Sequence, residues 1–244
     1  MDSVVVIAGA NGGLGSNVLR HLLSSGVRNV ACHYRGNRDR IDAILGEFDL
    51  DPDEHAFQAE LTDEEAVSAM AAAIEARRGP VGVLLNFAGG SSNGMVWKLD
   101  KAEFQRIMDM NVTSTFLTCK AFIPGMRERR FGRIVNVSSV VGSKGAPGAS
   151  HYAAAKAAVD GLTKSMSLEL VRRGITVNAL ALGYFDAGII STIPEPVKEA
   201  IIGTIPVGRL GESENEIGGL IRFLISPEAA YITGQTLHVN GGLH

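Results

Sequence analysis

Short apolar segments alternate with longer segments of helical spacing along the whole sequence, and this alternation limits the possible folds more than any other feature. The first apolar segment, residues 3–8, is continuous, which is typical of a strand buried on both faces of a sheet. The same patterns predict further strands at residues 29–33, 55–59, 81–86, 133–137, 176–182 and 236–239, and helices at 14–25, 38–48, 63–77, 101–129, 152–172 and 214–224. Repeated strand–helix units favour a parallel sheet, because right-handed crossovers place helices on both of its faces.

Residues 1–244 are predicted to form a single doubly wound α/β domain of the Rossmann type, with about seven parallel strands. No low-complexity linker or short repeat divides the sequence. A chain of 244 residues buries roughly 70–75% of its unfolded surface, so it needs no disulfide or metal to hold its core. Residues 183–211 are irregular, contain glycine and proline, and are too long for an ordinary connection, so we expect a substrate-covering lid there.

The composition disfavours several function classes. Lysine and arginine number 23 and aspartate and glutamate 26, which gives a formal net charge of −3 and disfavours a nucleic-acid partner. No stretch approaches the ~20 apolar residues of a membrane span, and the start of the chain lacks a signal-peptide pattern. Cys32 and Cys119 lie in apolar segments and are expected to be free thiols in a reducing, cytoplasmic setting. The six histidines show no ligand spacing, so no metal is expected.

Residues 9–15, the glycine turn, read Gly-Ala-Asn-Gly-Gly-Leu-Gly and join the first predicted strand to the first predicted helix. Glycines permit a tight turn and let backbone N–H groups approach a pyrophosphate, which the helix N-terminus then stabilises. The spacing is G-x-x-x-G-x-G, for which a tight turn without a ligand is the alternative. The position at the first strand–helix junction favours a dinucleotide. The residues of this turn predicted to bind the cofactor are Gly9, Asn11, Gly12, Gly13, Leu14 and Gly15.

The end of the second predicted strand indicates which dinucleotide is bound. A carboxylate there would accept hydrogen bonds from the adenosine ribose and repel a 2′-phosphate. The sequence instead has Tyr34 followed by Arg35. A guanidinium paired with a phosphate contributes about 1.5–3 kcal/mol, so we predict NADPH rather than NADH. The alternative is that Arg35 and Arg38 are the solvated start of a helix.

Tyr152 and Lys156 carry the predicted chemistry. Their four-residue offset puts the phenol and the ammonium on one face of a helix. A free phenol has a pKa near 10, and a cation within about 4–6 Å lowers such a pKa by 1–3 units. Ser139 follows a strand, at the sheet edge where a serine can donate a hydrogen bond to a substrate carbonyl. Each has a structural alternative: a surface contact for the pair, and a turn or helix cap for the serine.

Taken together, these residues resemble the short-chain dehydrogenase/reductase family over essentially the whole chain. The matching positions are Gly9, Gly13, Gly15, the segment Asn-Phe-Ala-Gly at 86–89, Asn111, Ser139, Tyr152 and Lys156. The resemblance implies that Tyr152 is the general acid in reduction, that Lys156 tunes Tyr152 and binds the nicotinamide ribose, and that Ser139 positions the carbonyl. It further implies that Asn111 keeps a proton-relay water. The other cofactor contacts predicted are Tyr34, Arg35, Glu60, Leu61, Asn86, Ala88, Gly89, Tyr152, Lys156 and Gly183.

Several positions depart from the family pattern. Ala8 stands where threonine is usual, so a turn-stabilising hydroxyl is missing. Phe87 replaces a second asparagine. After the sixth predicted strand, Leu182 and Ala187 replace a proline and a threonine that contacts the nicotinamide carboxamide. These changes imply that the nicotinamide is anchored differently here.

Within the family, the segments 139–142, 151–156 and 173–178 are most similar to 3-oxoacyl-[acyl-carrier-protein] reductases. This implies NADPH-dependent reduction of a 3-oxoacyl thioester carried by acyl carrier protein or coenzyme A. The alternatives are another short-chain dehydrogenase, acting on a sugar, alcohol, aromatic or CoA-linked hydroxy acid and possibly NAD-dependent, or a noncatalytic cofactor-binding subunit. Arg130 and Arg173 match carrier-docking positions, although cations there also complement helix dipoles. The family is usually homotetrameric.

Overall fold

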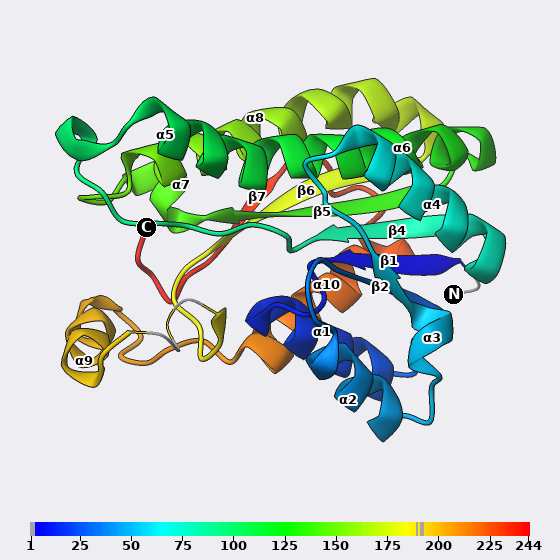
Figure 1. Ribbon diagram of the computed structural model, residues 1–244, viewed down its shortest axis with the longest axis horizontal. Coiled ribbons are helices and arrows are strands. Elements are labelled where there is room, and N and C mark those ends of the chain that lie inside the picture. The colour runs from blue at the N-terminus through cyan, green and yellow to red at the C-terminus, as the bar shows by residue number, and fades with distance from the viewer. Residues whose placement is uncertain (1–2, 189, 191–192) are drawn as a thin grey trace.

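Seven parallel strands form the centre of the computed structural model, which describes residues 3–188, 190 and 193–244 (Figure 1). Their order in the sheet is β3-β2-β1-β4-β5-β6-β7. The strands are β1 Val4–Ala8, β2 Val30–Tyr34, β3 Ala56–Gln58, β4 Val81–Asn86, β5 Gly132–Ser139, β6 Ile175–Leu182 and β7 Thr236–Val239. The predicted Rossmann-type α/β domain with a seven-stranded parallel sheet is therefore confirmed.

Helices cover both faces of this sheet. They are α1 Gly13–Ser24, α2 Asp39–Glu47, α3 Pro52–His55, α4 Glu64–Arg78, α5 Lys101–Met108, α6 Ser114–Arg129, α7 Val140–Lys144, α8 Ser150–Leu170, α9 Glu195–Thr204 and α10 Gly218–Leu224. Two π-helical turns, Asp109–Thr113 and Ser213–Ile217, precede α6 and α10, and 3-10 turns lie at Val96–Lys98, Val171–Arg173 and Pro227–Ala229.

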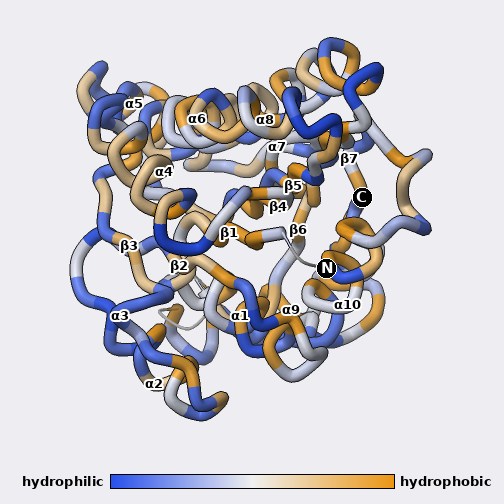
Figure 2. The backbone as a smooth tube through the Cα atoms, turned by 90° about the vertical axis from the view of Figure 1, so that its right-hand side faces the viewer, coloured by the Kyte–Doolittle hydropathy of each residue, from blue (hydrophilic) through white to orange (hydrophobic). Residues whose placement is uncertain are grey.

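The core consists of two apolar layers, one on each side of the sheet. Alternate residues of β1 point to opposite faces: Val5 and Ile7 pack with α1, α2 and α10, whereas Val4, Val6 and Ala8 pack with α4, α6 and α8. Figure 2 shows hydrophobic residues concentrated in β1 and the neighbouring strands between the helical layers. Cys32 and Cys119 are buried free thiols, one in each layer. In the described ranges, no helix has both the length and the apolar character needed to cross a membrane.

Three short helices were not expected from the sequence. Pro52 begins α3 behind the Asp51 cap, whose carboxylate accepts from the Asp53 N–H at 3.0 Å, and this shortens the third strand. The Ser139 hydroxyl accepts from the Val141 N–H at 3.2 Å and starts α7. Residues 183–211 are not irregular throughout, because α9 lies within them, although residues 189, 191 and 192 fall outside the described part.

The strand order reverses beside β1, which pairs with β2 on one side and with β4 on the other. Ala8 is aligned with Asn86, so β1 and β4 end side by side at the same edge of the sheet. In a doubly wound sheet, the connections leave such adjacent strands in opposite directions and open a crevice between them. The fold therefore places its ligand-binding edge at the glycine turn and at the segment that follows Asn86.

Candidate active site

The glycine turn is shaped by close approaches of the backbone. Gly9 has φ +84°, and a Cβ atom on it would lie 2.7 Å from the Ala88 N. A Cβ atom on Gly15 would lie 2.4 Å from the Gly9 carbonyl oxygen. Helix α1 begins at Gly13, and in the described part of the chain no side chain caps its amino end. The turn thus presents the amino end of α1 to an anion, and it fits the pyrophosphate of a dinucleotide.

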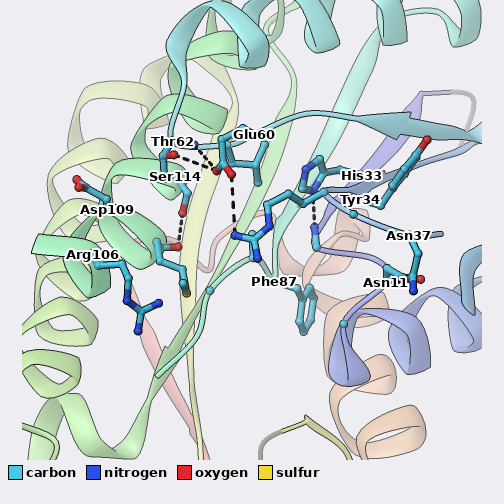
Figure 3. Close-up of a pocket in the computed structure, with 18 residues that line it drawn as sticks. Asn11, His33, Tyr34, Asn37, Glu60, Thr62, Phe87, Arg106, Asp109 and Ser114 are labelled. Atoms are coloured by element: carbon cyan, nitrogen blue, oxygen red, sulfur yellow. Dashed lines mark hydrogen bonds and ion pairs between the residues drawn. The ribbon is translucent and has the colours of Figure 1, made fainter. Parts of the chain in front are cut away.

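A cavity of about 630 Å³ opens beyond the glycine turn, along the carboxyl ends of β1, β2 and β4. Figure 3 shows His33, Tyr34 and Asn37 on one side of it and Arg106 and Asp109 on the other. The predicted cofactor residues that line it are Gly9, Asn11, Gly12, Tyr34, Arg35, Glu60, Leu61, Ala88 and Gly89. Lining residues that the sequence did not single out as contacts are His33, Gly36, Asn37, Thr62, Phe87, Arg106, Asp109, Met110 and Ser114. The predicted residues outside its lining are Gly13, Leu14, Gly15, Asn86, Tyr152, Lys156 and Gly183.

Arg35 is an exposed cation that lines this cavity just beyond the end of β2. Its Nη1 lies 3.9 Å from Glu60 Oε2, and its side chain is 69% exposed. The neighbouring Arg38 is held away by Asp42 at 3.1 Å and by Asp53 at 2.6 Å. Arg35 therefore remains available to an additional anion, with Glu60 as the one carboxylate that competes for it among the ion pairs of the described residues.

The structure brings Ser139, Tyr152 and Lys156 together at the carboxyl end of β5. Tyr152 lies in the first turn of α8, and its phenol interacts with the Ser139 hydroxyl. The Lys156 Nζ lies 5.6 Å from the centroid of the Tyr152 ring and donates to the Val137 carbonyl at 2.8 Å. The adjacent Ser138 points elsewhere, because its hydroxyl donates to the Lys156 carbonyl at 3.2 Å. A phenol, a hydroxyl and an amine thus share one site, as proton transfer to a carbonyl requires.

The pKa of the Tyr152 phenol differs from the sequence expectation. Burial raises this pKa, and the hydrogen bond from Ser139 is the opposing influence. Lys156 does not produce the expected lowering. Burial lowers the pKa of Lys156 to about 8, although the Asp160 carboxylate acts against this change, so Lys156 loses its charge before the phenol of Tyr152 ionises. At neutral pH the phenol is therefore protonated, which is the form that a general acid needs.

Asn111 lies in the π-helical turn before α6. Its Nδ2 donates to the carbonyls of Gly90 at 2.8 Å and Ile107 at 2.9 Å. A Cβ atom on Gly89 would lie 2.6 Å from Asn111 Oδ1 and 3.6 Å from Lys156 Nζ. Asn111 therefore lies beside Lys156, across the backbone of Gly89.

Asn86 is in the core rather than at the cavity. Its Nδ2 donates to Asn136 Oδ1 at 2.9 Å, and its Oδ1 accepts from the Thr118 hydroxyl at 2.8 Å. Asn136 in turn donates to Thr163 Oγ1 at 2.9 Å. These bonds join β4 and β5 to α6 and to α8, the helix that carries Tyr152 and Lys156, so the direct role of Asn86 here is in the sheet.

A second polar cluster lies at the start of α8. His151 is fully buried, and its Nε2 lies 2.8 Å from the Ser92 hydroxyl, which donates to the Glu103 carboxylate. Hydrogen bonds from Arg106 and Ser92 lower the pKa of Glu103 to about 2. The cluster joins the loop after β4 to the turn that carries Tyr152. No spacing in the sequence indicates it, because its members come from three separate segments.

The segment after β6 lies against the glycine turn. A Cβ atom on Gly13 would lie 2.5 Å from the Gly188 N, and one on Gly183 would lie 2.7 Å from the Asn240 Cα. Asp186 Oδ1 accepts from the N–H and the hydroxyl of Ser213 at 3.0 and 2.6 Å. The base of the expected lid is thus held between α1 and the turn before α10.

Two comparisons with known proteins agree with this geometry. A family model described as Enoyl-(Acyl carrier protein) reductase matches residues 8–244. Nodulation protein G of Azospirillum brasilense is 39% identical over 244 residues, which cover 100% of this chain and 98% of that protein. The 3-oxoacyl-[acyl-carrier-protein] reductases FabG of Staphylococcus aureus and Vibrio cholerae are 36% and 38% identical over 245 and 243 residues. These alignments cover 100% and 99% of this chain and 99% and 97% of those proteins. The sheet order, the glycine turn and these matches show that the chain belongs to the short-chain dehydrogenase/reductase family of NAD(P)-dependent oxidoreductases.

Proposed function

We propose that this enzyme reduces a 3-oxoacyl thioester, carried by acyl carrier protein or coenzyme A, to the 3-hydroxyacyl form with NADPH. The observation that carries the proposal is the cluster of Ser139, Tyr152 and Lys156 at the same sheet edge as the glycine turn. The reductases among its relatives supply the substrate class. Reduction of this kind is a step in fatty acid biosynthesis, and a cytoplasmic location is part of the same proposal.

The side chains have distinct tasks in this reaction. The bound nicotinamide supplies a hydride to the carbonyl carbon. Tyr152 donates its phenolic proton to the carbonyl oxygen, while the Ser139 hydroxyl holds that oxygen by a hydrogen bond. The Lys156 ammonium holds a ribose hydroxyl and stabilises the phenolate left on Tyr152. Asn111 keeps a water that returns a proton through Lys156.

The segment after β6 supports a second candidate function. Leu182 and Ala187 lack the proline and the hydroxyl that the family uses next to the nicotinamide. A different ketone or alcohol, of a sugar, an aromatic compound or a CoA-linked hydroxy acid, is therefore the second candidate. A noncatalytic cofactor-binding subunit is disfavoured by the grouping of Ser139, Tyr152 and Lys156 at one site.

Carrier docking at Arg130 and Arg173 is part of the proposal only in an oligomer. Arg130 Nη2 donates to the Arg172 carbonyl at 3.2 Å, so Arg130 lies close to the segment that contains Arg173. Arg130 and Arg173 lie just before the first residues of β5 and β6, whereas Ser139 is the last residue of β5. The eight residues of β5 span roughly 26 Å, so these cations lie far from Ser139 in the same subunit. A homotetramer, which we also propose, would bring one subunit's cations near another's site. Exposed apolar side chains on α5, α6 and α8 support such an assembly: Phe104, Phe116 and Leu168.

A substrate panel tests the function directly. We expect NADPH oxidation with a simple 3-oxoacyl thioester at a higher kcat/KM than with sugar, aromatic or simple alcohol–ketone substrates. Coenzyme binding without turnover on any carbonyl compound would favour the noncatalytic alternative instead.

Arg35 is expected to select NADPH. Arg35→Ala should lower kcat/KM for NADPH by roughly 10–100-fold and leave that for NADH nearly unchanged, because one charge-assisted pair to the 2′-phosphate is lost. Arg38→Ala is the matched control, because Arg38 is already paired with Asp42 and Asp53. Steady-state kinetics with both coenzymes provide the measurement, and an NADH preference in the unchanged enzyme would contradict the assignment.

Lys156 is expected to set an alkaline limit on activity. Its pKa is lowered to about 8, so the ammonium loses its proton as the pH rises through that value, whereas the phenol of Tyr152 stays protonated. Because kcat/KM for the coenzyme reports the free enzyme, it should fall about tenfold per pH unit above pH 8. Asp160→Asn should move this limb to lower pH, because the Asp160 carboxylate raises the pKa of Lys156. A flat profile between about pH 7 and 9.5 would exclude this role.

A further inference from the structure

His33 is a buried side chain that holds the glycine turn. It is the second-last residue of β2, with 3% of its surface exposed, and it forms part of the cavity wall. Its Nδ1 accepts a hydrogen bond from the Gly9 N–H at 2.9 Å, and its Nε2 lies 3.0 Å from the Ala59 carbonyl oxygen. The adjacent Ala8 has no polar side chain, so the first amide of the turn finds its acceptor on the neighbouring strand. One imidazole thus joins β1, β2 and the end of β3.

These partners allow only one protonation state of the ring. The Gly9 N–H is a donor, so Nδ1 must carry a lone pair. The Ala59 carbonyl is an acceptor, so Nε2 must carry the proton. A second proton on Nδ1 would place two N–H groups against each other and leave the half-buried Gly9 amide without this partner. The neutral ring therefore fits the turn, and the imidazolium does not.

The surrounding charges favour the same state. Burial is the largest influence and lowers the pKa of His33, as does the Arg35 guanidinium, whereas the bond to the Ala59 carbonyl and the Glu60 carboxylate raise it. Because the pKa lies below its ordinary value of 6.5, the ring is neutral at neutral pH and gains its second proton only in acid. The stabilisation of the turn is thus present above pH 6.5 and is lost as the pH falls toward the lowered pKa.

We propose that His33 is a positioning residue that fixes the coenzyme-binding turn through the Gly9 amide, and that its protonation releases the turn and weakens coenzyme binding in acid. This rests on the coenzyme site of the proposed function. Loss of the Gly9 bond affects the glycine turn, which is where the pyrophosphate is expected to bind. A displaced Gly9 also changes the contacts of this turn with Ala88 and Gly15. Coenzyme affinity, rather than the chemical step, is therefore the property that His33 controls.

Two variants separate the two bonds of the ring. Asparagine Oδ1 occupies the position of Nδ1, so His33→Asn keeps the acceptor for Gly9 and removes the titratable group. Glutamine Nε2 occupies the position of the histidine Nε2, so His33→Gln keeps the donor to Ala59 and leaves the Gly9 amide unpaired. We expect His33→Gln to raise the NADPH Kd about fivefold or more at pH 7.5, and His33→Asn to change it less than twofold. Coenzyme fluorescence titration is the measurement.

The pH series is the second test of the affinity claim. As the pH falls from 7.5 through the lowered pKa of His33, the Kd of the unchanged enzyme should rise more steeply than that of His33→Asn, because only the former loses the Gly9 bond to a proton. Equal pH dependence in the two proteins, or equal weakening by Asn and Gln at pH 7.5, would overturn the proposal.

Hydrogen exchange in the coenzyme-free chain tests the bond without the ligand and without any substitution. The Ala10 N–H donates to the His33 backbone carbonyl at 3.0 Å, and that bond does not titrate. After correction for intrinsic rates, the protection of the Gly9 amide should fall in acid while that of Ala10 is kept. Parallel behaviour of the two amides would overturn the proposal. Failure of the unchanged enzyme to bind any dinucleotide would instead overturn the proposed function, and this exchange experiment would still decide the role of His33.

Discussion

Tyr152→Phe is expected to lower kcat for carbonyl reduction by at least a hundredfold while coenzyme affinity stays within about twofold. The substitution removes the phenolic proton and leaves the ring in place. General acid catalysis contributes about 10²–10⁴-fold, and that is the factor at risk. Because burial keeps the phenol protonated at neutral pH, the unchanged enzyme holds the proton that the phenylalanine variant lacks. Steady-state kinetics with a 3-oxoacyl thioester, together with coenzyme titration, provide the measurement.

Tyr231→Phe is the matched control for this variant. Tyr231 is fully exposed, with a relative exposure of 101%, so removal of its hydroxyl should leave kcat unchanged. Retained activity in Tyr152→Phe would remove the proton-transfer mechanism. Parallel loss of coenzyme binding in Tyr152→Phe would indicate that the ring has a structural rather than a chemical role.

Gly9→Ala is expected to raise the coenzyme Kd by about 10- to 100-fold. The new methyl group would lie 2.7 Å from the Ala88 N and 2.8 Å from the Ala88 Cα, and backbone atoms cannot move aside as a flexible side chain can. The φ of +84° adds strain for any residue with a Cβ atom. Relief of both requires the turn to shift from the amino end of α1, where the pyrophosphate is expected. Coenzyme titration of the variant measures the effect.

Gly46→Ala provides the comparison. A Cβ atom on Gly46 meets nothing within 4 Å, and the residue lies in helix α2, so alanine should leave coenzyme binding unchanged and keep or increase stability. If Gly9→Ala bound the coenzyme as tightly as Gly46→Ala, the glycine turn would not be the binding site.

The sheet and the glycine turn could be predicted from the sequence because local sequence patterns determine them. The continuous apolar run before Gly9 and the glycine spacing after it predict a buried strand, a tight turn and a helix. Helix α8 was similarly accessible, since the spacing of Tyr152 and Lys156 is a property of the helix itself. Residues 183–211 were expected to be irregular, but α9 lies within them because Pro196 fits its first turn, where proline is tolerated. The substrate-covering role of this segment stays a prediction.

The remaining parts of the site depend on tertiary contacts. Arg106 and Asp109 become cavity walls only because α5 lies opposite the glycine turn. His33 carries no motif, and its role follows from the register that puts it beside Gly9 and Ala59. The raised pKa of Tyr152 could not be predicted either, because the sequence shows that a lysine is near but not how deeply both groups are buried.

A structure of the NADPH complex with a 3-oxoacyl substrate analogue is the most direct test. We expect the Tyr152 hydroxyl and the Ser139 hydroxyl both to lie within hydrogen-bonding distance of the analogue's carbonyl oxygen, with the nicotinamide ring facing the carbonyl carbon. A Tyr152 hydroxyl that faces away from the nicotinamide, or that is separated from it by protein, would contradict the account.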